Sequence, residues 1–197
     1  MRFCLGLTGS IGMGKSTTAQ MFVDQGCAVW DADAAVHRLY HVGGSAVGPI
    51  GAVFPEAVKD GMVQRDALRQ IIGRNPDAFK QIEDIVHPLV GQDRARFRKK
   101  ATADILVFDN PILFETGGDT AMDAVAVVSV SGELQEKRVL ERRTMTREQF
   151  LQIREKQMPD DEKRARADFL IITDTLDHAR QQVQDIVAQI RTGIANA

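Results

Sequence analysis

The sequence has few cysteines, no excess of charge of one sign and no long apolar run. Its 197 residues include two cysteines, 25 Lys plus Arg and 27 Asp plus Glu, which gives a formal net charge of -2. This balance indicates neither a basic nucleic-acid-binding module nor an acidic tail. Cys4 and Cys27 lie in apolar segments without the spacing of a zinc site or a disulfide framework, so we interpret both as core residues.

The lack of a long apolar run bears on membrane insertion. No run reaches the roughly 18–20 residues that a bilayer span needs, and the first segment becomes polar at Thr8, too early for the apolar centre of a signal peptide. We therefore expect a cytoplasmic protein without a membrane or nucleic-acid partner. Apolar residues make up 44% of the chain, enough for the core of a single folded domain, so disorder is excluded.

Short apolar runs alternate with longer amphipathic stretches along the chain, which is typical of an α/β fold. The runs are almost unbroken, as strands covered by helices on both faces require, so we predict a mainly parallel, five-stranded sheet flanked by helices. The predicted strands are residues 3–8, 28–30, 105–109, 124–130 and 169–173.

Residues 31–103 contain more helical pattern than a crossover between two strands needs. The stretch has only one weak strand-like break, at residues 48–54. We interpret the surplus as an inserted helical, substrate-binding region, at about residues 56–100 of the single domain.

A second helical surplus predicts a lid of two charged helices at about residues 133–158. Thr146, with Gln149 three residues later, forms a capping-box pattern that starts the second of these helices. The last stretch, residues 176–194, has apolar side chains on one face and should pack as a helix on the sheet.

The segment GSIGMGKS at residues 9–16 matches G-x-x-x-x-G-K-[ST] between a predicted strand and a predicted helix. Gly9, Gly12 and Gly14 let backbone N–H groups point at phosphate oxygens. Lys15 would bring a positive charge to the β- and γ-phosphates, and the hydroxyl of Ser16 would bind Mg²⁺. The alternative is a glycine-rich turn that only joins the strand to the helix.

A phosphate loop of this kind indicates a user of nucleoside triphosphates. The chain lacks the NKxD and D-x-x-G motifs of GTPases. A small chain with an insertion after the second strand and an arginine-rich lid fits best as a kinase for a small alcohol or phosphate acceptor.

Asp33 follows the second predicted strand, at the edge where open parallel sheets bind their ligands. In the functional interpretation, its carboxylate accepts a hydrogen bond, and finally the proton, from the acceptor hydroxyl. In the structural interpretation, Asp33 caps a helix that starts at Ala34. The two roles are compatible.

Asp109 ends an apolar strand in the Walker-B arrangement, which places a carboxylate near Mg²⁺. Because Asn110 and Pro111 follow directly, a plain turn is the alternative. In the lid, Arg142 would stabilise charge on the transferred phosphoryl group with Arg138 in support, unless these arginines only form ion pairs on a solvated helix.

The pair His87-Pro88 is a local helix breaker by the proline rule, and His87 would cap the helix end or contact a ligand. On the residues alone, the structural role is the commoner one.

Several of these segments, taken in order, resemble the dephospho-coenzyme A kinase family over nearly the whole chain. The matching segments are GLTGSIGMGKSTTAQMF, the DAD segment 31–33, residues 61–68 with Arg65, the HP pair, DNPILFE at 109–115, and the lid pattern from Gln135 to Gln157 with Ala167-Asp168. That family is similar in architecture to nucleotide monophosphate kinases, with a helical substrate domain and a lid.

The resemblance implies that ATP, with Mg²⁺, phosphorylates the ribose 3′-hydroxyl of dephospho-CoA, the last step of coenzyme A synthesis. It implies that residues 12–17, including Met13 and Thr17, bind the nucleotide phosphates, that Asp33 is the base and that Arg142 is the lid arginine. It also implies acceptor-site or metal-site roles for three further residues, which are His87, Arg65 and Asp109.

The sequence departs from the family pattern at a few positions. Ser10 replaces a usual glycine and Met13 a usual small residue, both at variable positions of the loop. Residues 173–175 replace the Asn-x-Gly turn that often lies near the adenine, so the resemblance assigns no adenine contacts here. Another small-molecule or nucleoside monophosphate kinase, and a slow nucleotide-binding switch, are the alternative functions.

Overall fold

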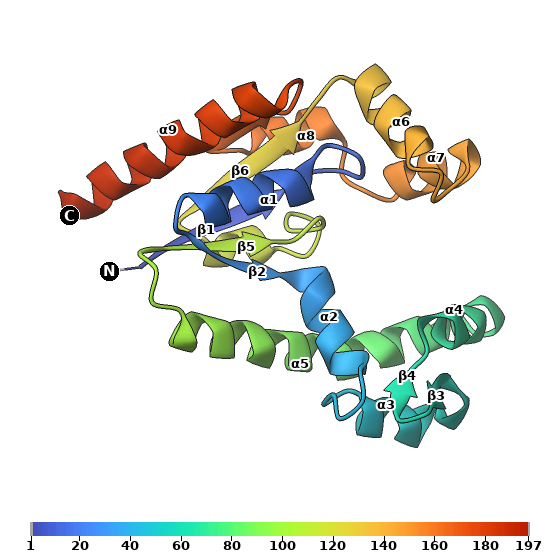
Figure 1. Cartoon of the computed structure of the whole chain (residues 1–197). Coiled ribbons are helices and arrows are strands. Elements are labelled where there is room, and N and C mark those ends of the chain that lie inside the picture. Colours follow the sequence, from blue (N-terminus) through green and yellow to red (C-terminus); the bar gives the residue numbers. More distant parts are fainter. Residues whose placement is uncertain (1, 197) are drawn as a thin grey trace. The chain divides into compact units, whose positions relative to one another are not determined.

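The computed structural model of the chain describes residues 2–196, which divide into two compact units. One unit runs to Trp30 and resumes at Ala101, and the other is Asp31–Lys100. Figure 1 follows the chain through both units. The helical unit begins well before residue 56, where the sequence analysis placed the insertion, because the helix after Asp31 contributes Leu39 to its core.

The first unit is built on a five-stranded sheet with strand order β2-β5-β1-β6-β7. Strand β1 pairs in parallel with β5 and β6, and β6 pairs in parallel with β7. The predicted α/β fold with a mainly parallel sheet is therefore confirmed. The strands are β1 (Phe3–Thr8), β2 (Ala28–Asp31), β5 (Ile105–Asp109), β6 (Ala124–Ser129) and β7 (Phe169–Ile172).

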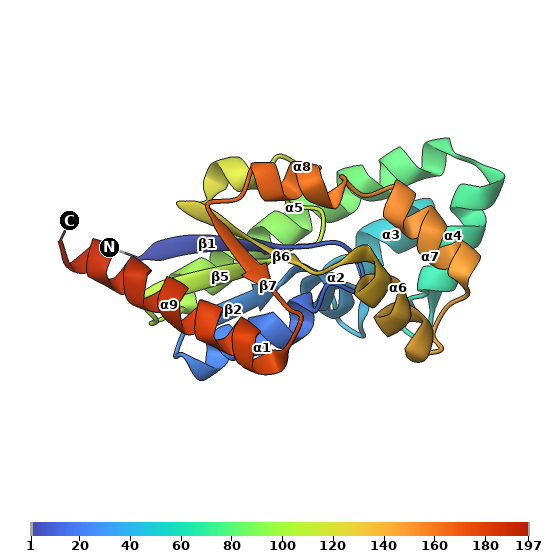
Figure 2. The ribbon, with the colours of Figure 1, turned by 90° about the horizontal axis from the view of Figure 1, so that it is seen from above.

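Helices cover both faces of this sheet (Figure 2). Because side chains alternate along a strand, Ala126 and Val128 pack with α1 and α9, whereas Val125 and Val127 pack with Leu113 on the opposite face. The helices of this unit are α1 (Lys15–Asp24), η2 (Gly118–Ala121), α6 (Gly132–Glu141), α7 (Arg147–Glu155), α8 (Asp160–Ala165) and α9 (Leu176–Ala195).

Two local predictions for this unit are confirmed. Helix α7 starts with a capping box, in which the Thr146 hydroxyl accepts from the Gln149 N–H and the Gln149 side chain accepts from the Thr146 N–H. Helix α9 buries its predicted apolar face, which comprises Val183, Ile186, Val187 and Ile190.

Both cysteines are buried, as predicted, and neither forms a disulfide. Burial raises the pKa of the Cys27 thiol to about 11, although the nearby Arg191 guanidinium acts in the opposite direction.

The helical unit is held by its own apolar core, which includes Leu39, Ile50, Leu68, Ile82 and Val86. Its elements are α2 (Ala32–Tyr40), α3 (Val47–Val53), η1 (Pro55–Ala57), β3 (Val58–Lys59), β4 (Met62–Val63), α4 (Arg65–Arg74) and α5 (Asp77–Lys100).

The prediction of a strand-like break at residues 48–54 is wrong, because Val47–Val53 forms helix α3. This stretch has two glycines, a proline and several β-branched residues, which are poor helix formers. Ile50 is nonetheless fully buried, and Phe54, four residues later, is 8% exposed in the same core. Tertiary packing of these side chains outweighs the weak local preference.

The prediction that the helix breaks at His87-Pro88 is also wrong, because α5 continues through Pro88. A proline inside a helix costs roughly 3 kcal/mol. Val86 is buried and Leu89 and Val90 pack against the same core, so burial on both sides of Pro88 offsets that cost.

Among residues 2–196, no helix is both long enough and apolar enough to cross a membrane.

Lys163, in α8, is a fully buried charge in the first unit. Its Nζ donates to the Pro111 carbonyl and to Glu115 Oε1, both at 2.9 Å. Burial by itself would raise the pKa of Glu115, but hydrogen bonds from Lys163 Nζ and the Met158 N–H outweigh burial and hold that pKa below its ordinary value. The pair therefore fixes α8 and the segment before it to the loop after β5.

We predict that Glu115→Gln lowers the free energy of unfolding by roughly 3 kcal/mol at pH 7, because Lys163 is left buried without a counter-charge. A carboxyl whose pKa is lowered by folding stabilises the protein above its ordinary pKa of roughly 4.3, and this stabilisation is lost as the pH falls through the folded value. The difference between variant and wild type should therefore shrink below about pH 4. Urea unfolding at both pH values measures it.

The control for this prediction is Glu162→Gln, which changes an exposed carboxylate next to Lys163 on the same helix. It should leave stability nearly unchanged at both pH values. An equal loss for Glu115→Gln at pH 7 and pH 3.5 would contradict the ionic explanation.

Candidate active site

The phosphate loop joins β1 to α1 and has two residues in left-handed conformations. Gly12 has φ 80° and Gly14 has φ 91°, which residues with a side chain rarely adopt. The Met13 N–H donates to the Ser10 carbonyl at 3.2 Å, so the loop contains a tight turn. Helix α1 begins at Lys15 without a side-chain cap, which leaves its first N–H groups available to an anion.

Close packing at the loop also requires glycine. A Cβ on Gly9 would lie 2.6 Å from the Val128 carbonyl oxygen of β6, and a Cβ on Gly12 would lie 2.5 Å from Val139 Cγ2 of α6. The first helix of the predicted lid therefore packs directly on the phosphate loop.

Lys15 and Asp109 form an ion pair between the phosphate loop and the end of β5. This carboxylate is 2% exposed and the Lys15 side chain is 15% exposed. Asp109 is also followed by a turn, in which the Asn110 side chain accepts from the Ile112 N–H at 3.1 Å. Ser16, at the start of α1, is exposed. Ser16 and Asp109 carry hard oxygen atoms of the kind that Mg²⁺ prefers as ligands.

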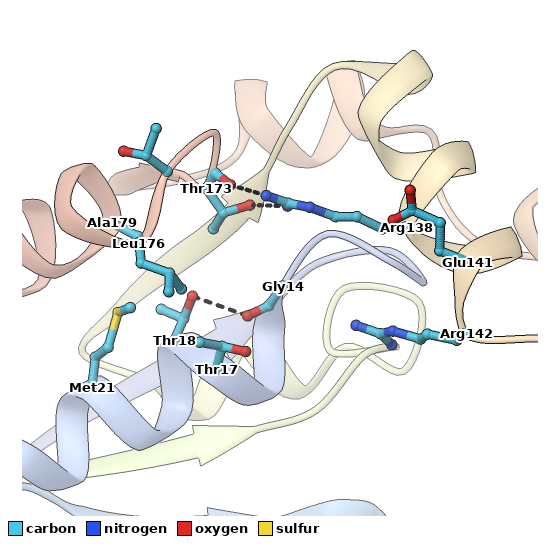
Figure 3. Close-up of a pocket in the computed structure, with 11 residues that line it drawn as sticks. Gly14, Thr17, Thr18, Met21, Arg138, Glu141, Arg142, Thr173, Leu176 and Ala179 are labelled. Atoms are coloured by element: carbon cyan, nitrogen blue, oxygen red, sulfur yellow. Dashed lines mark hydrogen bonds between the residues drawn. The ribbon is translucent and has the colours of Figure 1, made fainter.

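A cavity of about 360 Å³ lies beside the loop, between α1, α6 and the junction of β7 with α9 (Figure 3). Its wall combines polar groups with apolar side chains, among them Leu176, which is 62% exposed. The lining residues are Gly14, Thr17, Thr18, Met21, Arg138, Glu141, Arg142, Thr173, Thr175, Leu176 and Ala179.

Thr173 links three parts of this cavity wall. Arg138 Nη1 donates to the Thr173 hydroxyl at 3.0 Å and Arg138 Nη2 donates to the Thr173 carbonyl at 2.5 Å (Figure 3). The Thr173 hydroxyl in turn donates to the Met13 carbonyl at 2.7 Å. Thr173 therefore joins the phosphate loop to the segment after β7, and Arg138 of α6 holds Thr173 in place.

Arg142 lies at the C-terminal end of α6 and is exposed. Figure 3 shows its side chain extending toward the side of the cavity where Gly14 and Thr17 lie. It makes no hydrogen bond or ion pair with any of residues 2–196. Ion pairs do occur nearby, between Arg147 and Glu136 and between Lys137 and Glu141. The alternative that lid charges only form ion pairs on a solvated helix therefore holds for these residues and not for Arg142.

Asp33 lies in the first turn of α2 and is exposed. The helix cap predicted for it is wrong, because α2 begins at Ala32 and its cap is Asp31, whose carboxylate accepts from the Ala34 N–H at 2.9 Å. Within the described part of the chain, the Asp33 carboxylate has no hydrogen-bond partner. It is therefore available to a ligand.

The other two predicted acceptor residues lie on separate helices of the helical unit. Arg65 is the first residue of α4, and its guanidinium lies 5.9 Å from the centroid of the Tyr40 ring. His87 is exposed in the middle of α5, with Nε2 3.8 Å from Glu83 Oε1, so it does not cap a helix. No hydrogen bond or ion pair among residues 2–196 joins Asp33, Arg65 and His87.

Sequence reasoning missed residues that organise the loop from outside its motif. Gln135 and Gln157 both hydrogen-bond the Ile11 backbone, and Thr173 bonds Met13. The only signal for the glutamines was their place in the resembling lid pattern. Thr173 gave no signal, because it stands where that pattern differs.

The fold and the loop together place the chain among the P-loop kinases, since a glycine-rich phosphate loop follows the first strand of the parallel sheet and a helix bearing arginines packs on it. The family model for dephospho-CoA kinase matches residues 3–178. The chain belongs to the dephospho-CoA kinase family and is a kinase.

One curated relative and two solved structures are similar to this chain over nearly its whole length. A dephospho-CoA kinase of Ruegeria pomeroyi is 69% identical over 197 residues, which is 100% of both chains. A crystal structure from Thermus thermophilus has a TM-score of 0.86 at 29% identity and covers 95% of this chain and 97% of its own. A dephospho-CoA kinase from Campylobacter jejuni has a TM-score of 0.70 at 24% identity, with 98% and 99% covered, and shows the shared fold.

We predict that Gly12→Ala weakens ATP binding by about tenfold or more, because the added methyl group meets Val139 and the left-handed backbone is strained. Isothermal titration with ATP measures the change. Gly132→Ala is the control, since its Cβ would meet nothing within 4 Å. Adding Val139→Ala should recover only the steric part, and full ATP affinity in Gly12→Ala itself would contradict the prediction.

Proposed function

We propose that the protein transfers the γ-phosphoryl group of ATP to the ribose 3′-hydroxyl of dephospho-CoA, giving coenzyme A and ADP. The observation that carries this proposal is 69% identity to a dephospho-CoA kinase over the whole length of both chains. The complete phosphate loop between β1 and α1 supports it. The cytoplasmic location and the absence of a nucleic-acid partner stay predictions from the sequence.

On the nucleotide side, the backbone of residues 12–17 would bind the phosphates, with Gly9 allowing the loop to lie against β6. The nucleoside would occupy the 360 Å³ cavity, where Leu176 and Met21 offer apolar contact to a base and Thr175 offers hydrogen bonds. Residues 173–175 would thus serve in place of the Asn-x-Gly turn that the sequence lacks.

Magnesium would be held by the Ser16 hydroxyl and, directly or through water, by Asp109. The ion usually keeps several waters and takes one or two protein ligands besides the phosphates, so it needs no dense ligand cluster. Residues 2–196 contain no group of three or more His, Cys, Asp or Glu that could hold a metal. When bound, Mg²⁺ neutralises charge on the β- and γ-phosphates.

Lys15 and Arg142 would act on the transferred phosphoryl group. Lys15 is positioned at the loop by Asp109, and Arg142 has a free guanidinium directed toward the phosphate side of the cavity (Figure 3). A cation that strengthens its contact as charge moves onto the phosphoryl oxygens lowers the barrier of the reaction.

Asp33 would accept a hydrogen bond from the acceptor hydroxyl and, late in the transfer, its proton. Its unpartnered carboxylate supports this role, and the helix-cap role that competed with it belongs to Asp31. Arg65 and His87 would bind the anionic groups of dephospho-CoA, since both are exposed on the helical unit.

The test of the function is ADP release with dephospho-CoA as acceptor, with the product identified by mass. Strong stimulation and an added phosphoryl group at the 3′-oxygen are expected. No stimulation by dephospho-CoA, together with phosphorylation of AMP or another acceptor, would overturn the proposal in favour of a different kinase.

We predict that Asp33→Asn lowers kcat by roughly 10²–10⁴-fold, because the amide cannot take the proton, while the ATP dissociation constant changes less than about twofold. Stopped-flow turnover and ATP titration measure the two quantities. Asp31→Asn is the matched control, since asparagine caps a helix as well as aspartate does. Equal losses in turnover and ATP affinity for Asp33→Asn would show a structural role instead.

A further inference from the structure

Two glutamines of the lid region, Gln135 and Gln157, form hydrogen bonds with the backbone of Ile11 in the phosphate loop. Gln135 Nε2, in α6, donates to the Ile11 carbonyl at 2.7 Å. The Ile11 N–H donates to Gln157 Oε1 at 3.0 Å, and Gln157 lies two residues beyond the end of α7. The beginning of α6 and the segment that follows α7 thus meet at the same backbone position.

Ile11 is the second residue of a tight turn, a kind of turn that proteins form in two main types. The Met13 N–H bonds the Ser10 carbonyl, and Gly12, the third residue of this turn, has φ 80°. A positive φ at that place is the mark of a type II turn. Types I and II differ by rotation of the central peptide, which here joins Ile11 to Gly12.

Gln135 selects between these two forms. A trans peptide is planar, so its C=O and N–H point in opposite directions. By holding the Ile11 oxygen on the α6 side, the Gln135 amide directs the Gly12 N–H away from α6. A rotated peptide would expose the Ile11 oxygen in place of that donor, which would repel a phosphate.

The surroundings of Gln135 make this contact difficult to replace. Gln135 is only 3% exposed, so water has little access to its amide. The absence of a Cβ on Gly12 lets α6 approach closely enough, since that atom would lie 3.1 Å from the Gln135 carbonyl oxygen. Losing the amide would leave the part-buried Ile11 carbonyl without this partner.

We propose that Gln135 and Gln157 are positioning residues of the phosphate loop. Gln135 locks the Ile11–Gly12 peptide in the orientation that presents the Gly12 N–H to the phosphates, and Gln157 anchors the preceding Ser10–Ile11 peptide of the same turn. The beginning of α6 and the segment after α7 then belong to the phosphate site, and they stay in contact with the loop if the rest of the lid moves. This inference rests on the proposed phosphoryl transfer, and it adds residues outside the loop motif to the site.

The variants Gln135→Met and Gln157→Met remove the amides at nearly constant side-chain length. Each should weaken ATP binding by about fivefold or more and lower kcat/KM accordingly, while the variant loses some thermal stability but stays fully folded at the assay temperature. Because both amides hold the same turn, their effects should not add. The double variant should have about the same ATP affinity as the single variant that binds ATP less tightly. Gln152→Met, at an exposed position of α7, is the control.

A second measurement reads the loop directly in the nucleotide-free protein. In ¹⁵N spectra, Gln135→Met should shift or broaden the Gly12 amide signal through exchange between two turn forms, and Gln157→Met should speed hydrogen exchange of the Ile11 amide. Gln152→Met should change neither signal.

Unaltered Ile11 and Gly12 amide signals, or ATP affinity equal to that of wild type, would overturn the inference. A loss of ATP affinity only in proportion to a loss of folded protein would also overturn it. If wild type fails to phosphorylate dephospho-CoA while the loop signals and ATP affinity respond as expected, the proposed acceptor is wrong and the positioning role stands.

Discussion

The structure depends on the close approach of backbone to backbone at the phosphate loop. Gly9 lies against the Val128 carbonyl, and Gly12 lies against α6, at distances that no side chain would allow. This approach lets three side chains hold the loop from outside, which are Gln135 of α6, Gln157 after α7 and Thr173 after β7. A site that must meet a highly charged ligand is thereby rigid before the ligand arrives.

The strands and the phosphate loop could be predicted from the sequence because their signals are local. An unbroken apolar run such as residues 105–109 has only one good interpretation between helical stretches, and GSIGMGKS has a fixed spacing. The capping box at Thr146 was equally readable, since both partners lie within four residues. These elements appear in the structure with bounds that differ by a residue at most.

The errors and omissions have a common physical origin in long-range packing. Residues 48–53 and Pro88 are helical because apolar side chains of their helices pack in a core with side chains distant in sequence, which local preference does not report. Lys163 lies in the charged run DDEKRAR, so nothing local marks it as fully buried beside Glu115. The cap predicted at Asp33 has a different, local cause, because α2 begins two residues earlier than the sequence pattern indicates.

The burial of both cysteines also affects how the protein can be handled. Burial raises the pKa of Cys27 to about 11, which keeps the thiol protonated at neutral pH, whereas thiol reagents attack the ionised form. Cys4 is likewise buried. A single cysteine introduced on the surface would therefore accept a fluorescent dye or spin label selectively, without first replacing the native thiols.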